Sequence, residues 1–243
     1  MLQDIPQPYL SILIMLFVAW AAAYAIGMLT GQPNTLRTRR LPLASRLIMI
    51  GVVVAFGALG WLGWARTTIV ASYALWILLG LVMGALGDLL LGGVFPVPQA
   101  EMIALGVFGL GHLAYMAAII AARKALGIPT TYLLIGAPTG SIIGFAIWIL
   151  AIRNPAGSRK MNIGSLVYGS ILFVTVGMGI GAAIASSGMI LLAIGLALFA
   201  LSDVILAQYM LRRRRFPYIR DVVWIIYSAA QVIIALSSRT ALG

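Results

Sequence analysis

Eight apolar stretches divide the chain, and each is long enough to cross a lipid bilayer as a helix. A transmembrane helix needs about 20 apolar residues to span a hydrocarbon core of roughly 30 Å. Hydrophobic residues make up 63% of the 243 residues, which is well above the roughly 45–50% of soluble domains. The predicted spans are 9–30, 43–64, 71–93, 99–121, 129–151, 163–184, 187–209 and 218–237. We therefore expect an all-α membrane protein, with residues 1–243 forming one bundle of eight transmembrane helices.

The basic residues indicate how this bundle is oriented in the membrane. Loops after the first, third, fifth and seventh spans, with the adjoining helix ends, hold twelve of the sixteen: Arg37, Arg39, Arg40, Arg46, Arg153, Arg159, Lys160, Arg212, Arg213, Arg214, Arg215 and Arg220. Positive charge favours the cytoplasmic side, so these loops are expected there, with both termini outside and the chain in the cell membrane. The net charge of +11 then indicates headgroup contacts rather than nucleic-acid binding.

Two aspartates interrupt apolar spans in a chain that has five acidic residues in all. Asp88 lies in GLVMGALGDLLL and Asp203 in GLALFALSDVIL, and a shift of 115 residues lays one segment over the other. Four spans per half would make a parallel repeat, with halves 9–121 and 129–237 and an axis along the membrane normal. The repeat predicts that the two acidic helices approach one another near the centre of the bundle.

Polar side chains on the following spans are candidate partners of these acids. Under the same shift His112, the single histidine, overlies Tyr227. His112 and Tyr115 share a helix face, as do Tyr227 and Gln231, because residues three or four apart lie on one side of a helix. Gly80, Gly84 and Gly92 form a stripe of small residues with Asp88, so this face is expected to lie against another helix.

An ionised aspartate at the centre of a membrane helix costs about 2.5–3.5 kcal/mol to insert, so such residues usually serve function. The alternative is an interhelical hydrogen bond that only holds the bundle together. Two carboxyl groups at close range cannot easily both ionise, so one can act as a general acid and the other as a base. We predict that Asp88, Asp203 and His112 are catalytic, and that Tyr115, Tyr168, Tyr227 and Gln231 bind substrate. Glu101 and Asp221 lie near span ends, where hydrated residues are expected, and are left out.

Several other chemistries are disfavoured. The absence of cysteine and the single histidine make a catalytic zinc site improbable, since such sites usually take three protein ligands. The chain has neither the G-x-S-x-G nucleophile elbow nor a phosphate-binding P-loop. We therefore expect no metal and no cofactor.

Four motifs together resemble the YhhN-type, or lysoplasmalogenase, family of membrane proteins. They are GDLLL at 87–91, Phe108 with His112 and Tyr115, SDVILA at 202–207, and Tyr227 with Gln231. The similarity runs from about residue 76 to 235. The chain departs from the family pattern at Gln208, near a frequent asparagine, and at Ser228, within a frequent aromatic pair.

The resemblance implies hydrolysis of the vinyl ether bond of lysoplasmalogens, with a lysolipid as substrate and membrane lipids as neighbours. Asp88 and Asp203 would share the acid and base roles, His112 would relay protons or orient water, and Tyr227 and Gln231 would position the ether oxygen. A proton-coupled transporter and a lipid-binding scaffold remain alternatives that would use the same buried acids. Nothing in the sequence indicates an obligate protein partner.

Overall fold

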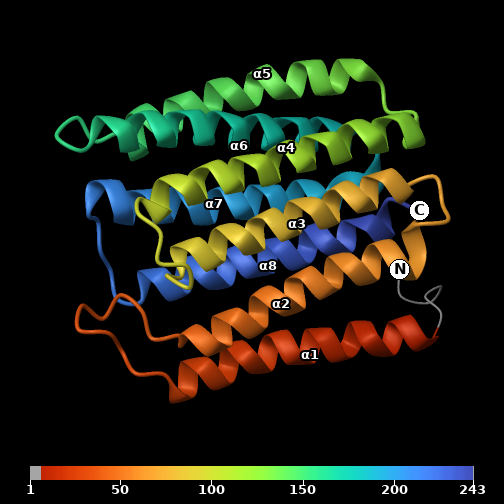
Figure 1. Ribbon diagram of the computed structural model, residues 1–243. Coiled ribbons are helices and arrows are strands. Elements are labelled where there is room, and N and C mark those ends of the chain that lie inside the picture. Colours follow the sequence, from red (N-terminus) through yellow and green to blue (C-terminus); the bar gives the residue numbers. More distant parts are fainter. Residues whose placement is uncertain (1–6, 243) are drawn as a thin grey trace.

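The computed structural model describes residues 7–242, and these form the expected bundle of long helices (Figure 1). The helices are α1 Gln7–Thr30, α2 Leu43–Leu59, α3 Ala71–Leu91, α4 Ala100–Leu126, α5 Thr130–Ile147, α6 Arg159–Ala185, α7 Ile190–Arg212 and α8 Ile219–Thr240. Wider π-helical turns extend α2 through Gly60–Ala65 and α5 through Trp148–Ile152. Within residues 7–242, eight helices are long and apolar enough to cross a membrane, which confirms the predicted number of spans.

The ends of the helices follow local chemistry. Gly127 ends α4 in the left-handed conformation (φ +67°), and its N–H bonds the carbonyl of Arg123. Glycine takes this conformation without a Cβ clash, and the nearby Pro129 cannot continue a helix. Ser186, in extended conformation, separates α6 from the short 3₁₀ turn Ser187–Met189. The structure therefore has a break between the predicted spans 163–184 and 187–209.

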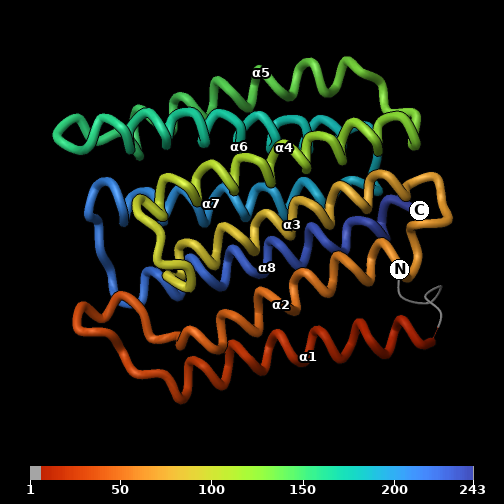
Figure 2. Tube along the Cα trace, in the orientation of Figure 1, coloured from red at the N-terminus to blue at the C-terminus, as the bar shows by residue number. Residues whose placement is uncertain are grey.

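The helices form a flattened bundle in which α1 and α5 lie at opposite edges (Figures 1 and 2). From the α5 edge the order is α5, α6, then α4 with α7, then α3 with α8, then α2 and α1. The adjoining pairs α3–α4, α5–α6 and α7–α8 pack most extensively. The two edge helices bury the smallest share of their surface. In a bilayer their apolar side chains would face lipid, as the composition of the chain predicts.

Glycines set the closest helix approach, between α5 and α6. A Cβ on Gly136 would overlap the backbone at Gly177, and one on Gly140 would overlap the carbonyl of Phe173. Small residues allow such backbone contact between membrane helices. This packing fixes α6, which carries Tyr168 toward the centre of the bundle.

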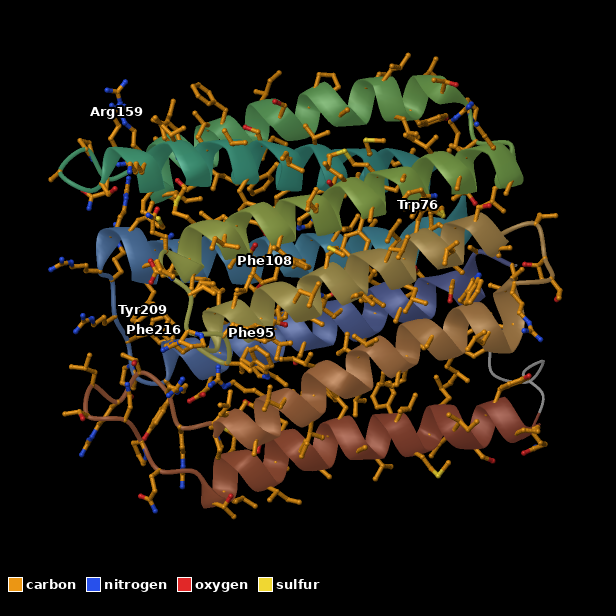
Figure 3. All side chains as sticks on the ribbon, viewed as in Figure 1. Trp76, Phe95, Phe108, Arg159, Tyr209 and Phe216 are labelled. Atoms are coloured by element: carbon orange, nitrogen blue, oxygen red, sulfur yellow. The ribbon has the colours of Figure 1, made fainter. Side chains whose placement is uncertain are left out.

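The loops after α1, α3, α5 and α7 lie together at one end of the bundle. Figure 3 shows many side-chain nitrogen atoms at this end, where Arg159, Tyr209 and Phe216 are labelled. We call it the arginine-rich end. The described chain begins and finishes at the opposite end. The first six residues and the last one, on which the prediction for the two termini depends, lie outside the described range. The fold is compatible with the two predicted repeat halves, which stay a prediction.

Candidate active site

A cavity of about 140 Å³ extends from the arginine-rich end into the middle of the bundle. Residues of α2, α3, α4, α6, α7 and α8 form most of its wall, with Ile152 from the turn that extends α5. Much of the wall is apolar or aromatic, and includes Leu91, Ala104, Leu105, Phe108, Leu172, Phe173, Val204, Leu206, Val223 and Trp224. A cavity of this composition suits an apolar ligand held by a few polar groups.

Asp88 from α3 and Asp203 from α7 both line this cavity. Each is partly exposed although it lies inside a membrane-spanning helix, because its surface faces the cavity. The two carboxyl groups are also within electrostatic range of each other. The structure thus brings the two predicted acids together in one apolar compartment, where charge interactions are stronger than in water.

The carboxylate of Asp203 accepts a short hydrogen bond from the Tyr168 hydroxyl, through Oδ2. Tyr168 comes from α6 and lines the cavity beside Asp203. Its ring contacts the Phe108 ring at a centroid distance of 6.5 Å. Tyr168, a predicted substrate-binding residue, therefore also holds one of the two acids.

The partner of Asp88 is the Tyr227 hydroxyl, from α8. Tyr227 belongs to a chain of hydrogen bonds with a defined direction. The Tyr115 hydroxyl donates to Gln231 Oε1 at 2.7 Å, and Gln231 Nε2 donates to the Tyr227 hydroxyl oxygen at 2.8 Å. Since the Tyr227 oxygen accepts from Gln231, its own proton is free to point toward Asp88.

This chain of donors also shows where two predicted substrate-binding residues lie. Tyr115 is 1% exposed and Gln231 is 2% exposed, and neither lines the main cavity. They stand behind Tyr227, which does line it. Tyr168 and Tyr227 are thus placed to touch a ligand, whereas Tyr115 and Gln231 are placed to orient Tyr227.

The glycines of α3 provide the space for this arrangement. A Cβ on Gly84 would lie 2.6 Å from Gln231 Nε2 and 3.0 Å from the Tyr227 hydroxyl oxygen. One on Gly80 would overlap the Tyr115 ring, and one on Gly87 would lie 2.7 Å from Phe108 Cζ. Gly80 and Gly84 of the predicted glycine stripe therefore make room for side chains from α4 and α8. Gly87, which is not part of the stripe, makes room for the Phe108 ring in the same way.

His112 lies one layer away from the cavity. It is fully buried and does not line the cavity wall, and its ring packs on Phe199 at a centroid distance of 4.7 Å. Neither ring nitrogen has a hydrogen-bond partner within the described residues. Its ring contacts that of Tyr168, which does line the cavity, at a centroid distance of 5.9 Å. The structure therefore does not bring His112 to either carboxyl group, and its catalytic role stays a prediction.

Three arginines that the sequence indicated as topology anchors also line the cavity: Arg39, Arg46 and Arg220. The sequence could have indicated that Arg46 faces the interior, because this residue lies three positions inside the second predicted span.

The expectation that Asp221 is hydrated is wrong. Asp221 is 2% exposed, and its carboxylate accepts the backbone N–H groups of Arg40 at 2.6 Å and Leu41 at 3.0 Å.

Across residues 7–242, no group of three or more His, Cys, Asp or Glu side chains is placed to hold a metal ion. The polar side chains of the cavity wall carry carboxyls, tyrosine hydroxyls, guanidiniums and the hydroxyl of Ser165. Such groups can transfer protons, donate hydrogen bonds and bind an anion.

Comparison with known proteins gives one match. The model of the YhhN family matches residues 59–238, a range that contains all four motifs quoted above. No curated protein and no solved structure matches the chain.

Proposed function

Because this chain belongs to the YhhN family, we propose that it is a membrane-embedded hydrolase that cleaves the vinyl ether bond of lysoplasmalogens. The products are a fatty aldehyde and glycerophosphoethanolamine or glycerophosphocholine. The observation that carries the proposal is the pairing of Asp88 and Asp203 in one apolar cavity, each with a tyrosine hydroxyl beside it. No cofactor is needed for this reaction.

The chemistry begins with proton transfer to carbon. A carboxylic acid of the pair gives its proton to the outer alkene carbon, and the electron pair of the double bond forms the new C–H bond. The inner carbon and the ether oxygen then share the positive charge of an oxocarbenium ion. The other group of the pair, as a carboxylate, stabilises this cation and removes a proton from the attacking water.

Water addition gives a hemiacetal, which collapses in the second half of the reaction. The hemiacetal hydroxyl loses its proton and becomes the aldehyde C=O, the bond to the glycerol oxygen breaks, and that oxygen takes up a proton. One water is consumed, and both carboxyl groups return to their starting forms. Tyr168 and Tyr227 hold the two carboxyl groups in place during these transfers.

The cavity wall suits such a substrate. Its apolar residues can accommodate the alkenyl chain, and its polar groups are concentrated near the acids and at the arginine-rich end. The lining ends at the layer of Phe108 and Tyr227. Beyond it, toward the opposite end of the bundle, Tyr73, Ala118 and Ile119 are at most 1% exposed. A cavity that stops in mid-membrane supports catalysis over a transport path.

The test is aldehyde release by detergent-purified protein given a lysoplasmalogen. Free aldehyde and free fatty acid are measured separately, with an ester lysolipid in a parallel reaction. We expect aldehyde from the vinyl ether, and we expect Asp88→Asn and Asp203→Asn each to abolish its release. Asparagine keeps the size of the side chain but can neither donate a carboxyl proton nor accept one.

Thermal unfolding and monodisperse elution show that each variant is folded. Wild-type turnover in either asparagine variant would overturn the mechanism. Fatty acid release in place of aldehyde would indicate a lysophospholipase, and the absence of both products would favour the transporter or lipid-binding alternatives.

We also propose that the arginine-rich end faces the cytoplasm in the cell membrane, since basic loops are retained on that side. A cleavable tag after residue 243 should then be accessible to protease from outside intact cells. A tag that is cut only after the cells are opened would reverse this orientation.

A further inference from the structure

Three arginines converge on the outer part of the cavity that holds the acid pair. Arg39 comes from the loop between α1 and α2, Arg46 from the first turn of α2, and Arg220 from the first turn of α8. Arg46 is within electrostatic range of both other arginines, and also of the carboxyl groups of Asp88 and Asp221. These acids offset part of the repulsion among the three positive charges, and a negative ligand would relieve the remainder.

Within the described residues, the guanidinium groups of these arginines are held by little besides the contact of Arg46 with the Trp224 ring. None of the three forms an ion pair with a carboxylate or donates a side-chain hydrogen bond within residues 7–242. Other arginines differ: Arg40 Nε donates to the Gly31 carbonyl at 3.0 Å, and Arg212 Nε donates to the Arg153 carbonyl at 3.1 Å. Arg46 therefore keeps a buried donor without a hydrogen-bond partner among the described residues, and half-buried Arg39 and Arg220 keep donors that a ligand can reach.

Arg46 is the most informative of the three. It is 7% exposed, lines the cavity, and its buried Nε has no hydrogen-bond partner among the described residues. Its guanidinium lies 5.8 Å from the centroid of the Trp224 ring, which also lines the cavity. Burying a guanidinium donor without a partner costs free energy. An oxyanion in the cavity would supply the missing acceptor.

The segment that carries Arg39 is held rigidly against α8. Asn34 Oδ1 accepts the backbone N–H groups of Thr38 at 2.8 Å and Arg39 at 3.0 Å. The Arg220 N–H bonds the Thr38 carbonyl at 2.9 Å. Asp221 holds the next two residues through their N–H groups, as described above. Its carboxylate is thus hydrogen-bonded to the backbone, and it acts on Arg46 and Arg220 through its charge alone.

From the unsatisfied donors and their rigid support, we propose that Arg39, Arg46 and Arg220 bind the phosphate of the lysolipid substrate. Arginine is well suited to phosphate because its planar donors match the phosphate oxygens. Arg220 lies about 10 Å, two helical turns, before Tyr227 along α8. The glycerol backbone of the substrate and the reach of the arginine side chain together cover this separation. The assignment rests on the proposed lysolipid function, and it makes the phosphate a requirement for tight binding.

The test measures binding without turnover. The probes are a 1-O-alkyl lysophosphatidylcholine, whose saturated ether the proposed reaction cannot cleave, and the 1-O-alkylglycerol of the same chain length, which lacks phosphate. Equilibrium titration in detergent should show the phospholipid binding at least about tenfold more tightly, since the alkylglycerol lacks the charged group that would accept hydrogen bonds from the arginines. Inorganic phosphate alone should bind far more weakly than the phospholipid probe.

Arg46→Gln should weaken phospholipid binding about tenfold or more and leave alkylglycerol binding unchanged. Arg46→Lys, which keeps the charge but loses the planar donors, should recover part of the loss. Arg39→Gln and Arg220→Gln test the same site at half-buried positions, where folding is less at risk. Arg66→Gln, at the opposite end of the bundle, is the matched control and should leave both affinities unchanged.

The outcomes separate this site from the proposed reaction. Unchanged phospholipid affinity in the folded arginine variants would remove the phosphate site, even if the wild type releases aldehyde. Loss of affinity in these variants, without aldehyde from a lysoplasmalogen, would keep the site and remove the reaction. Inorganic phosphate that binds as tightly as the phospholipid would show a site for free phosphate, and would overturn the lysolipid assignment.

Discussion

The two acid-bearing regions of the bundle share a sequence motif but hold their carboxyl groups differently. Asp203 on α7 accepts directly from Tyr168, whose ring packs in an aromatic layer with Phe108. Asp88 on α3 is paired with Tyr227, which Gln231 and Tyr115 orient from behind. Asp88 is also within range of Arg46. The similarity of the motifs therefore does not extend to their partners, and the two acids can be perturbed separately.

The largest effect among the partner residues is expected from Tyr168→Phe. The Tyr168 hydroxyl is the neighbour that donates directly to the Asp203 carboxylate, so its removal frees that group to rotate. Because positioned acid–base groups contribute about 10²–10⁴-fold, we expect kcat for aldehyde release to fall about 100-fold. Tyr132→Phe, on the exposed face of α5, is the matched control and should keep full turnover. Equal rates for the two variants would show that Asp203 does not need this partner.

Tyr227→Phe should have a smaller effect, a fall of about tenfold in kcat, since a typical hydrogen bond contributes roughly 0.5–1.5 kcal/mol. When the Tyr227 hydroxyl is lost, Asp88 still interacts with the positive charge of Arg46. Steady-state kinetics of Tyr168→Phe and Tyr227→Phe, measured side by side, rank the two acids. A larger loss for Tyr227→Phe would reverse the ranking.

Gly84→Ala tests the support of Asp88 without altering a polar group. The new Cβ would lie 2.6 Å from Gln231 Nε2, so the chain from Tyr115 to Tyr227 must shift. Overpacking typically costs about 1–3 kcal/mol, and we expect a lower unfolding temperature with a several-fold loss of turnover. Gly106→Ala is the control, because a Cβ there meets nothing within 4 Å. Similar unfolding temperatures for the two variants would contradict the close packing at Gly84.

The smallest effect on turnover is expected from His112→Phe. Phenylalanine fills a similar space against Phe199 and removes two ring nitrogens that have no partner within the described residues. An unsatisfied buried polar group costs about 1–3 kcal/mol, so stability should be equal or higher. Turnover should fall by less than it does in Gly84→Ala. A loss as large as that of Tyr168→Phe would instead support the predicted proton relay, and a pH–rate profile would then locate the step.

The sequence was sufficient to predict the eight spans and the two central acids, because lipid imposes strong rules on composition. An aspartate within an apolar span is improbable unless it faces protein or water. Asp88 and Asp203 therefore stood out before any packing was known. The arginine-rich end was visible for a similar reason, since charge is excluded from the hydrocarbon region.

The partners of the acids could not be predicted, because they depend on how each helix is rotated and on which helices meet. The 115-residue shift made His112 and Tyr227 equivalent, yet only Tyr227 of the two is placed beside a carboxyl group. Tyr168 was a candidate without an assigned partner. It comes from α6, a helix that the 115-residue shift did not connect to Asp203. Hydrophobic patterns indicate which residues lie in the membrane, but they do not indicate which side chains touch.

The rigid segment between α1 and α2 has a consequence for how such a protein can change its substrate. The family match begins at residue 59 and includes Asp88, Asp203, Tyr168 and Tyr227. Arg39 and Arg46 come from the chain before that match, although they line the same cavity. Under the proposed function, two of the three phosphate-binding arginines therefore lie outside the stretch that carries the reaction, and only Arg220 lies within it. Exchanging the first two helices and their loop would then be expected to alter preference among lysolipids, while every residue of the acid pair and its tyrosines stays the same.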